Sequence, residues 1–251
     1  MAKLLRFLTL AFLGMVLPSL LLADDTTPQL FVAKIKNKVS IVRGGKKYKA
    51  VVPATLEETD RVVTGASSQA YLQFENGSVV EVGPNSDVKV GELDTQGSDF
   101  KAKFRLAFGK LKAKVQKLTT SSSSFEIEAG GVVAGVRGTV FGVDYDKAKN
   151  VVNAQTFEGS IFTLVGGKEE IVQKGLSLVV GKTGLPVQSP LTQEAISDFK
   201  DFNGVSGLLE KKKQEMMNQM KQKAGDQVRE KVGHDKEDLI KKVVDPSKLG
   251  F

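Results

Sequence analysis

The chain has 251 residues, with 36 Lys and Arg, 29 Asp and Glu, one His, no Cys, no Trp and a formal net charge of +7. The lack of cysteine excludes disulfides, thiolate nucleophiles and Cys-ligated zinc or iron–sulfur sites. Because His234 is the only histidine, Ser-His-Asp catalysis and HExxH metal chemistry are not expected. We therefore predict no catalytic residues, no metal site and no cofactor. The 25 Gly and 14 Phe favour short strands and tight turns, and they predict a mainly β protein.

The N-terminus has the features of a secretory signal peptide. Lys3 and Arg6 precede a Leu-rich run over residues 8–22, and Ala23 stands directly before Asp24. This order predicts cleavage after residue 23 and a periplasmic or secreted mature chain. An uncleaved segment would instead be a membrane anchor, and membrane contact is expected only in that case. Loss of the two cations lowers the formal charge to +5, and export argues against nucleic acid as a partner.

Residues 30–180 are dominated by short alternating runs between turn residues, which predict about a dozen strands packed as an antiparallel or solenoid-like β domain. In the run 31–41 we expect the odd positions to be buried and the lysines between them to face water. The pair Asn76-Gly77 predicts a hairpin. The buried parity flips at Gly109, which predicts a turn or bulge there.

The composition changes after Val180. Residues 181–207 are predicted to form a linker with a short helix that is capped by Thr192 and interrupted by Gly204 and Gly207. Residues 208–251 are rich in helix formers and charges, and they predict a helical tail.

A glycine-rich apolar run over residues 130–143 contains one cation, Arg137. A buried guanidinium without a partner would be very costly, so Arg137 must reach a carboxylate, backbone carbonyls or solvent. The nearest carboxylates in sequence are those of Glu126, Glu128, Asp144 and Glu158. We expect Arg137 to act as an internal tie between strands, with contact to a ligand as the alternative.

The sequence resembles the FecR domain family at several blocks in the same order. The most specific block is Val136-Arg137-Gly138-Thr139-x-Phe141-x-Val143. Further blocks lie at residues 59–65, 71–78, 106–111 and 157–161. Two positions depart from the family pattern: Thr59 replaces a common Gly, and Asn76 replaces the usual Asp.

This resemblance implies an extracytoplasmic β domain without enzymatic activity. The best-known members of the family are signalling regulators with a cytoplasmic anti-sigma segment, one membrane span and a periplasmic domain that contacts an outer-membrane transporter. The motif residues 136–139 and 141 would serve structure or partner contact. The present sequence departs from that plan because its N-terminus has the features of a cleavable signal peptide.

Two basic stretches contain no acidic residue. They supply a candidate binding face made of Lys34, Lys36, Lys38, Lys101, Lys103, Arg105, Lys110, Lys112 and Lys114. One interpretation is that these cations lie on solvated strand faces and prevent edge-to-edge association. The other is that they bind an anionic envelope polymer or lipid surface.

These observations predict a non-catalytic binding or scaffolding module of the bacterial cell envelope, whose partner is an envelope protein or an anionic surface. The alternative is a membrane-anchored signal transducer related to FecR-type regulators of sigma factors. An enzyme would have to use paired carboxylates such as Glu126 and Glu128, which are two residues apart on one predicted strand. The sequence does not predict an oligomeric state.

Overall fold

The structure is a computed structural model that describes residues 30–94, 99–209 and 211. Its described residues form strands with one helix over residues 193–209, which confirms the predicted mainly β fold. The strands are β1 (Leu30–Lys36), β2 (Val39–Arg43), β3 (Lys46–Lys49), β4 (Ala54–Leu56), β5 (Arg61–Thr64), β6 (Gln69–Phe74), β7 (Val79–Val82), β8 (Asp87–Asp94), β9 (Lys101–Lys114), β10 (Ser124–Ala129), β11 (Val132–Val136), β12 (Val140–Asp146), β13 (Val151–Glu158), β14 (Ser160–Val165), β15 (Lys168–Gln173), β16 (Leu176–Val180) and β17 (Pro186–Pro190).

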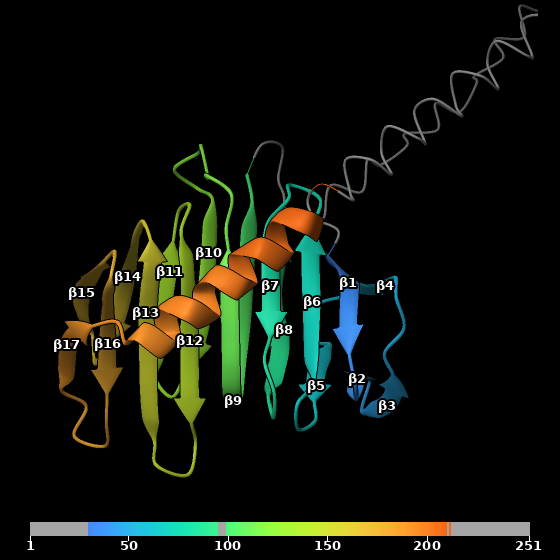
Figure 1. Ribbon diagram of the computed structural model, residues 1–251, viewed down its shortest axis with the longest axis horizontal. Helices are drawn as coiled ribbons and strands as arrows, with labels where there is room; N and C mark the ends of the chain where they lie inside the picture. Colours follow the sequence, from blue (N-terminus) through green and yellow to red (C-terminus); the bar gives the residue numbers. More distant parts are fainter. Residues whose placement is uncertain (1–29, 95–98, 210, 212–251) are drawn as a thin grey trace, which may run out of the picture.

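The strands form two sheets. Sheet A has the order β4-β1-β6-β7-β9-β12-β13-β16-β17, and sheet B has the order β3-β2-β5-β8-β9-β10-β11-β14-β15. All pairs are antiparallel except β9 with β10. The elements follow one another along the long axis in chain order, from β1–β4 at one end to β15–β17 at the other (Figure 1).

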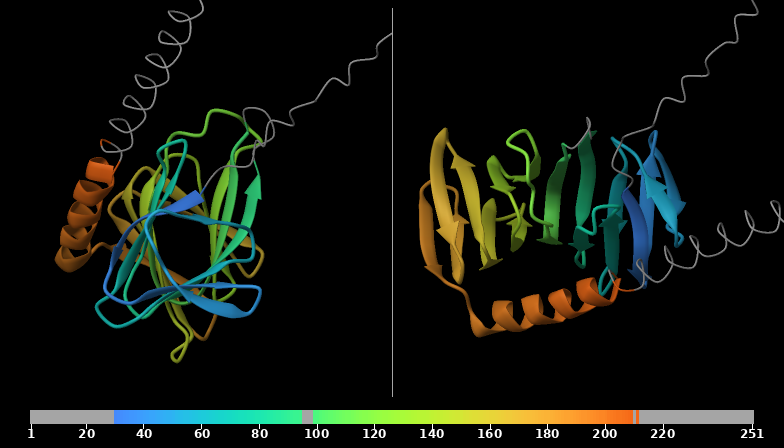
Figure 2. Two further views of the ribbon diagram at one scale, coloured as in Figure 1. Left: turned by 90° about the vertical axis from the view of Figure 1, so that its right-hand side faces the viewer. Right: turned by 90° about the horizontal axis from the view of Figure 1, so that it is seen from above.

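The core lies between the two sheets. Seen along the long axis, the sheets face each other around an elongated interior (Figure 2). At its centre the buried rings of Phe74, Phe104, Phe125 and Phe141 pack against one another, with centroids 5.6–6.3 Å apart. Aromatic rings at this spacing combine a large buried area with favourable edge-to-face contacts. The two sheets are therefore joined by one continuous apolar layer.

Strand β9 belongs to both sheets. Residues up to Phe108 pair with β8 and β10 in sheet B, and residues from Gly109 onward pair with β7 and β12 in sheet A. Gly109 has φ +101°, and this left-handed residue flips the inward-facing parity as the strand changes sheets. The predicted change at Gly109 is thus confirmed as an irregularity, although the strand continues through it.

The other local predictions differ in outcome. The Asn76-Gly77 hairpin joins β6 to β7 as expected. The predicted single run 31–41 is wrong, because Asn37 takes a positive φ and separates β1 in sheet A from β2 in sheet B. A register shift between Val32 and Lys34 also reverses the buried parity, so Leu30 and Val32 face the core in place of Phe31.

The segment 181–207 is more ordered than a linker. Residues 186–190 form β17 on the edge of sheet A, where they pair with β16. Thr192 caps the helix as predicted, with its Oγ1 accepting a hydrogen bond from the Ala195 amide at 3.2 Å. The predicted interruptions at Gly204 and Gly207 are wrong, since the helix continues to residue 209. The tail from residue 212 onward lies outside the described residues.

We predict that Gly109→Ala lowers the free energy of unfolding by about 2–4 kcal/mol, since it adds both left-handed strain and overpacking. A Cβ at this position would lie 2.5 Å from the Cα of Ser86, which is fully buried. Urea unfolding of the two proteins measures the change.

Gly131→Ala is the matched control, because Gly131 also has positive φ (+83°) but a Cβ there meets nothing within 4 Å. It should cost only about 1 kcal/mol. Equal losses in the two variants would contradict the role given to the contact with Ser86.

Candidate functional site

The residues of the Val136–Phe141 motif occupy the end of β11 and the start of β12. Val136 and Phe141 face the core and are almost fully buried, while Arg137 is exposed. Thr139 is buried, and its Oγ1 donates a hydrogen bond to the Ser160 carbonyl at 3.1 Å. Gly138 takes φ +127°, and a Cβ there would lie 3.0 Å from the Cα of Lys117. The motif therefore sits directly against the segment that leaves β9.

That segment, residues 115–123, is the crossover that returns the chain from β9 to its parallel neighbour β10. The amides of Val115 and Leu118 donate hydrogen bonds to the carbonyls of Thr139 and Arg137 at 3.0 and 3.3 Å. The Arg137 guanidinium donates through Nη2 to the carbonyls of Thr120 (3.0 Å), Ser121 and Ser123 (3.4 Å). Arg137 therefore reaches backbone carbonyls and solvent, and no ion pair joins it to a carboxylate among the described residues. These contacts favour the structural interpretation, and partner contact by the motif stays a prediction.

The nine candidate cations do not form one face. Lys34 and Lys36 lie on β1 in sheet A, and Lys38 lies in the turn that follows. The others all come from β9 but divide at Gly109: Lys101, Lys103 and Arg105 belong to sheet B, and Lys110, Lys112 and Lys114 belong to sheet A. Binding of an anionic surface by these residues remains a prediction, but no single sheet presents them all.

On sheet B, cross-strand acids balance the cations. Lys103 Nζ lies 3.5 Å from both Glu126 Oε2 and Glu128 Oε2, and Arg105 Nε lies 3.2 Å from Glu128 Oε2. The lysine stretch that lacks acids in sequence thus finds them on the parallel strand β10. The two glutamates proposed for an enzyme are paired with these cations on the outer face of the sheet.

On sheet A, the helix covers the outer face of the central strands. The helix runs diagonally across β13, β12, β9, β7 and β6 (Figure 1). Its buried side consists of Phe199, Phe202 and Leu209, which pack with Tyr71, Val79 and Val140 in a second apolar cluster. The ring of Phe199 stacks on Phe157 with centroids 5.5 Å apart. The helix therefore docks on the sheet through its own small core.

An ion-paired group lies beneath the helix. Lys112 Nζ is 3.2 Å from Glu81 Oε1 and 2.6 Å from Asp198 Oδ1 of the helix. The side chains of Lys112 and Glu81 are only 9% and 3% exposed. The expectation that Lys112 faces solvent is thus wrong, because the helix folds back over it. Burial, together with the nearby Glu81 carboxylate, raises the pKa of Tyr71 above its usual range.

A small pocket of about 220 Å³ opens beside the start of the helix, between Lys110, Asp144, Gln155 and Asp198. Burial raises the pKa of Asp144, and the charges of Lys110 and Lys112 only partly oppose this effect. Across residues 30–94, 99–209 and 211, no cluster of three or more His, Asp or Glu side chains could hold a metal ion. No helix within those residues is long and apolar enough to span a membrane.

Sequence reasoning missed the docking of this helix. The sequence does contain a pattern that indicates an amphipathic helix, because residues 199, 202, 206 and 209 recur at helical spacing. In the structure all four are buried. The pairing of Lys112 with Glu81 and Asp198 had no comparable signal, because the three residues come from β9, β7 and the helix.

We predict that Lys112→Met lowers the free energy of unfolding by about 3 kcal/mol, since it leaves the buried Glu81 carboxylate without its cation. Lys110→Met is the control: its side chain is 58% exposed and lies 3.9 Å from Asp144, so the loss should stay below about 1 kcal/mol. Urea unfolding compares the two, and similar losses would contradict the buried pairing.

We also predict that Arg137→Ala destabilises the protein by about 1–2 kcal/mol, because it removes hydrogen bonds to carbonyls of the crossover. Amide hydrogen exchange should speed up selectively in residues 115–123. Arg105→Ala removes an exposed arginine with a single ion pair and should leave that exchange unchanged. Unaltered exchange in Arg137→Ala would refute the structural role of this cation.

Residues 60–162 match the model of the FecR protein family. A search of curated proteins found no match. Two crystal structures of a "putative anti-sigma factor" from Parabacteroides distasonis align with TM-scores of 0.47 and 0.46, each at 9% identity over 55% of this chain. The chain spans 62% of the length of those proteins.

The family match confirms the resemblance over nearly the same residues as the motif blocks, a narrower range than the predicted β domain of residues 30–180. It covers β5 to β13 and the beginning of β14, while β1–β4 and β15–β17 extend the same two sheets beyond it. Residues 60–162 of this chain thus match a FecR domain.

Proposed function

We propose that this chain is a FecR-type regulator whose β domain lies outside the cytoplasm and binds an envelope protein as one step of a signalling pathway. The observation that carries this proposal is the FecR family match over residues 60–162, supported by the motif blocks around Arg137. Regulators of this family act by protein contact and carry out no chemistry. In this proposal the apolar run at residues 8–22 is kept as the membrane anchor.

The contacts of the motif limit where a partner can bind. Arg137, Gly138 and Thr139 are engaged with the crossover and with Ser160, and the helix covers much of the outer face of sheet A. A partner protein would therefore contact the uncovered outer face of sheet B or an end of the two-sheet domain. The paired Glu126 and Glu128 also argue for a non-enzymatic protein, because their carboxylates are already matched by Lys103 and Arg105.

The regulator function is tested by deleting the gene and restoring it in two forms. Deletion should change the transcript levels of a limited set of genes, and the full chain should restore them. A matched form that lacks residues 2–23 should fail to restore them, because it stays in the cytoplasm. Unchanged transcripts after deletion, or full restoration by the cytoplasmic form, would rule out an extracytoplasmic regulator.

A second candidate is an exported binding or scaffolding module without a membrane link. The observation that favours it is the small residue Ala23 directly before Asp24, which is typical of a cleavage site. The intact mass of the chain purified from its host separates the two candidates. A mass that includes residues 1–23 supports the anchored regulator, and a mass without them supports the free module.

A further inference from the structure

The end of the domain formed by β1–β4 carries an unusual combination of side chains. The hairpin β2–β3 and the loop that follows expose three lysines and three apolar side chains. We call these six residues the N-terminal end surface: Lys46, Lys47, Tyr48, Lys49, Val51 and Val52. Tyr48, Val51 and Val52 are 52%, 60% and 47% exposed, although most of the described valines are buried in this fold.

The apolar residues lie where the interior of the two sheets reaches the surface. Tyr48 pairs with Ile41, whose side chain belongs to the core, and β3 is the edge strand of sheet B. Val51 and Val52 lie on the segment that passes from β3 in sheet B to β4 in sheet A. Tyr48 lines two surface hollows. These exposed apolar groups therefore lie together at the end of the core.

The lysines of this surface have no matching acids. Residues 34–56 contain no Asp or Glu. The next acids along the chain that form ion pairs, Glu57 and Asp60, are engaged by Arg43 at 2.8 and 2.6 Å. Within the residues that the structure describes, no ion pair involves Lys46, Lys47 or Lys49. This differs from sheet B, where the lysines of β9 face glutamates.

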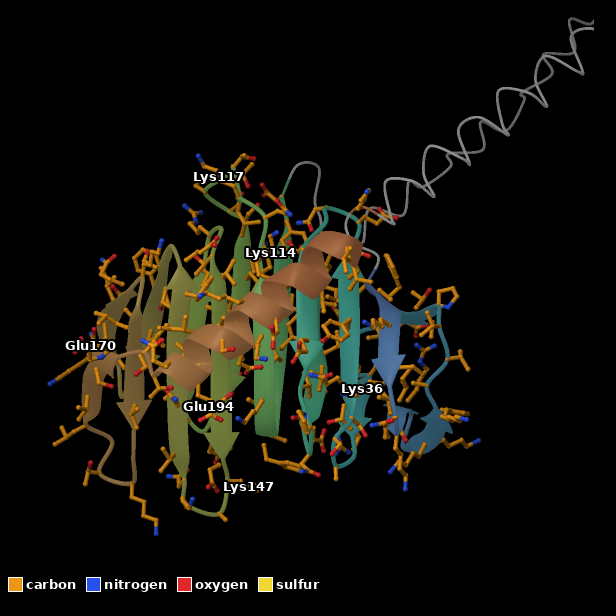
Figure 3. All side chains as sticks on the ribbon, viewed as in Figure 1. Lys36, Lys114, Lys117, Lys147, Glu170 and Glu194 are labelled. Atoms are coloured by element: carbon orange, nitrogen blue, oxygen red, sulfur yellow. The ribbon has the colours of Figure 1, made fainter. Side chains whose placement is uncertain are left out.

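The opposite end of the domain lacks this combination. It also exposes apolar side chains, but its edge strand β15 carries Glu169 and Glu170. The exposed apolar residues there are Phe162, Leu164, Ile171, Leu185 and Val187. Figure 3 shows Glu170 and Lys36 near opposite ends of the long axis. The edge strand of the N-terminal end therefore combines lysines with an exposed apolar side chain and carries no acid, whereas the edge strand β15 at the opposite end carries two.

We propose that the N-terminal end surface docks on anionic phospholipid headgroups. Lysines attract the phosphates, and Tyr48, Val51 and Val52 enter the boundary between headgroups and acyl chains, where Tyr and aliphatic side chains bind. A polyanionic glycan would also attract the lysines but offers no apolar layer for the two valines. The inference does not depend on the proposed regulator function.

The test uses the absence of cysteine from the chain. Val51→Cys in the full-length protein gives a single site for an environment-sensitive fluorophore, and Val187→Cys at the other end is its matched control. Vesicles of phosphatidylcholine with about 30% phosphatidylglycerol should shift the emission of the first fluorophore to the blue, and added salt should weaken the shift. Pure phosphatidylcholine vesicles should not shift the emission of this fluorophore, whether or not the chain is anchored in them.

Two charge-reversed variants then locate the effect. Lys46→Glu/Lys47→Glu/Lys49→Glu should weaken the shift at least about tenfold in lipid concentration. Lys147→Glu/Lys174→Glu/Lys182→Glu changes the net charge by the same amount at exposed positions elsewhere. This variant should show the same emission shift as the unchanged protein. Val51→Ser/Val52→Ser, read by vesicle co-sedimentation, should also weaken binding.

Several outcomes would overturn the proposal. These are an equal shift at residue 187, an equal shift on neutral vesicles, equal losses in the two lysine variants, or a response to peptidoglycan sacculi without one to anionic vesicles.

Discussion

The passage of β9 from one sheet to the other is the feature on which the rest of the structure depends. In its 14 residues this strand pairs with β8 and β10 in sheet B and then with β7 and β12 in sheet A. The change occurs at Gly109, where the buried Ser86 leaves no room for a side chain. Because one strand serves both sheets, their relative position follows from continuous backbone hydrogen bonding as well as from packing of the Phe core.

The contacts of the Arg137 motif and the docking of the helix both depend on β9. Since β10 is parallel to β9, the chain must return through residues 115–123, and the backbone polar groups of this crossover need partners. Arg137 and Thr139 supply several of them. The second half of β9 places Lys112 on the outer face of sheet A. There Lys112 forms an ion pair with Asp198, which helps to hold the helix on the sheet. The FecR motif and the helix therefore both stabilise the C-terminal half of β9 and the crossover that follows it.

The features that the sequence predicts well are those determined by neighbouring residues. The Asn76-Gly77 hairpin, the Thr192 cap and the parity change at Gly109 depend on local backbone preferences. The predictions that failed depend on distant strands. Lys112 has the alternation of a solvated lysine, and only the returning helix makes it buried. In the same way, the acids that balance Lys103 come from a strand some twenty residues away, so an acid-free stretch of sequence did not correspond to an acid-free surface.

The lysines of the domain differ in whether the fold brings an acidic side chain close to them. Over β9 the lysines of sheet B are matched across strands, whereas those of the N-terminal end surface are not. Three adjacent lysines without an ion pair among the described residues therefore lie together at one end of an elongated domain. Only residues 23–29 separate the apolar run at 8–22 from β1, and a chain of this length spans at most about 25 Å. If that run stays in the membrane, it holds Leu30 within about 25 Å of the membrane, and β1–β4 are then the end of the domain nearest to the anchor. Weak contacts of this end with headgroups would act at high local concentration.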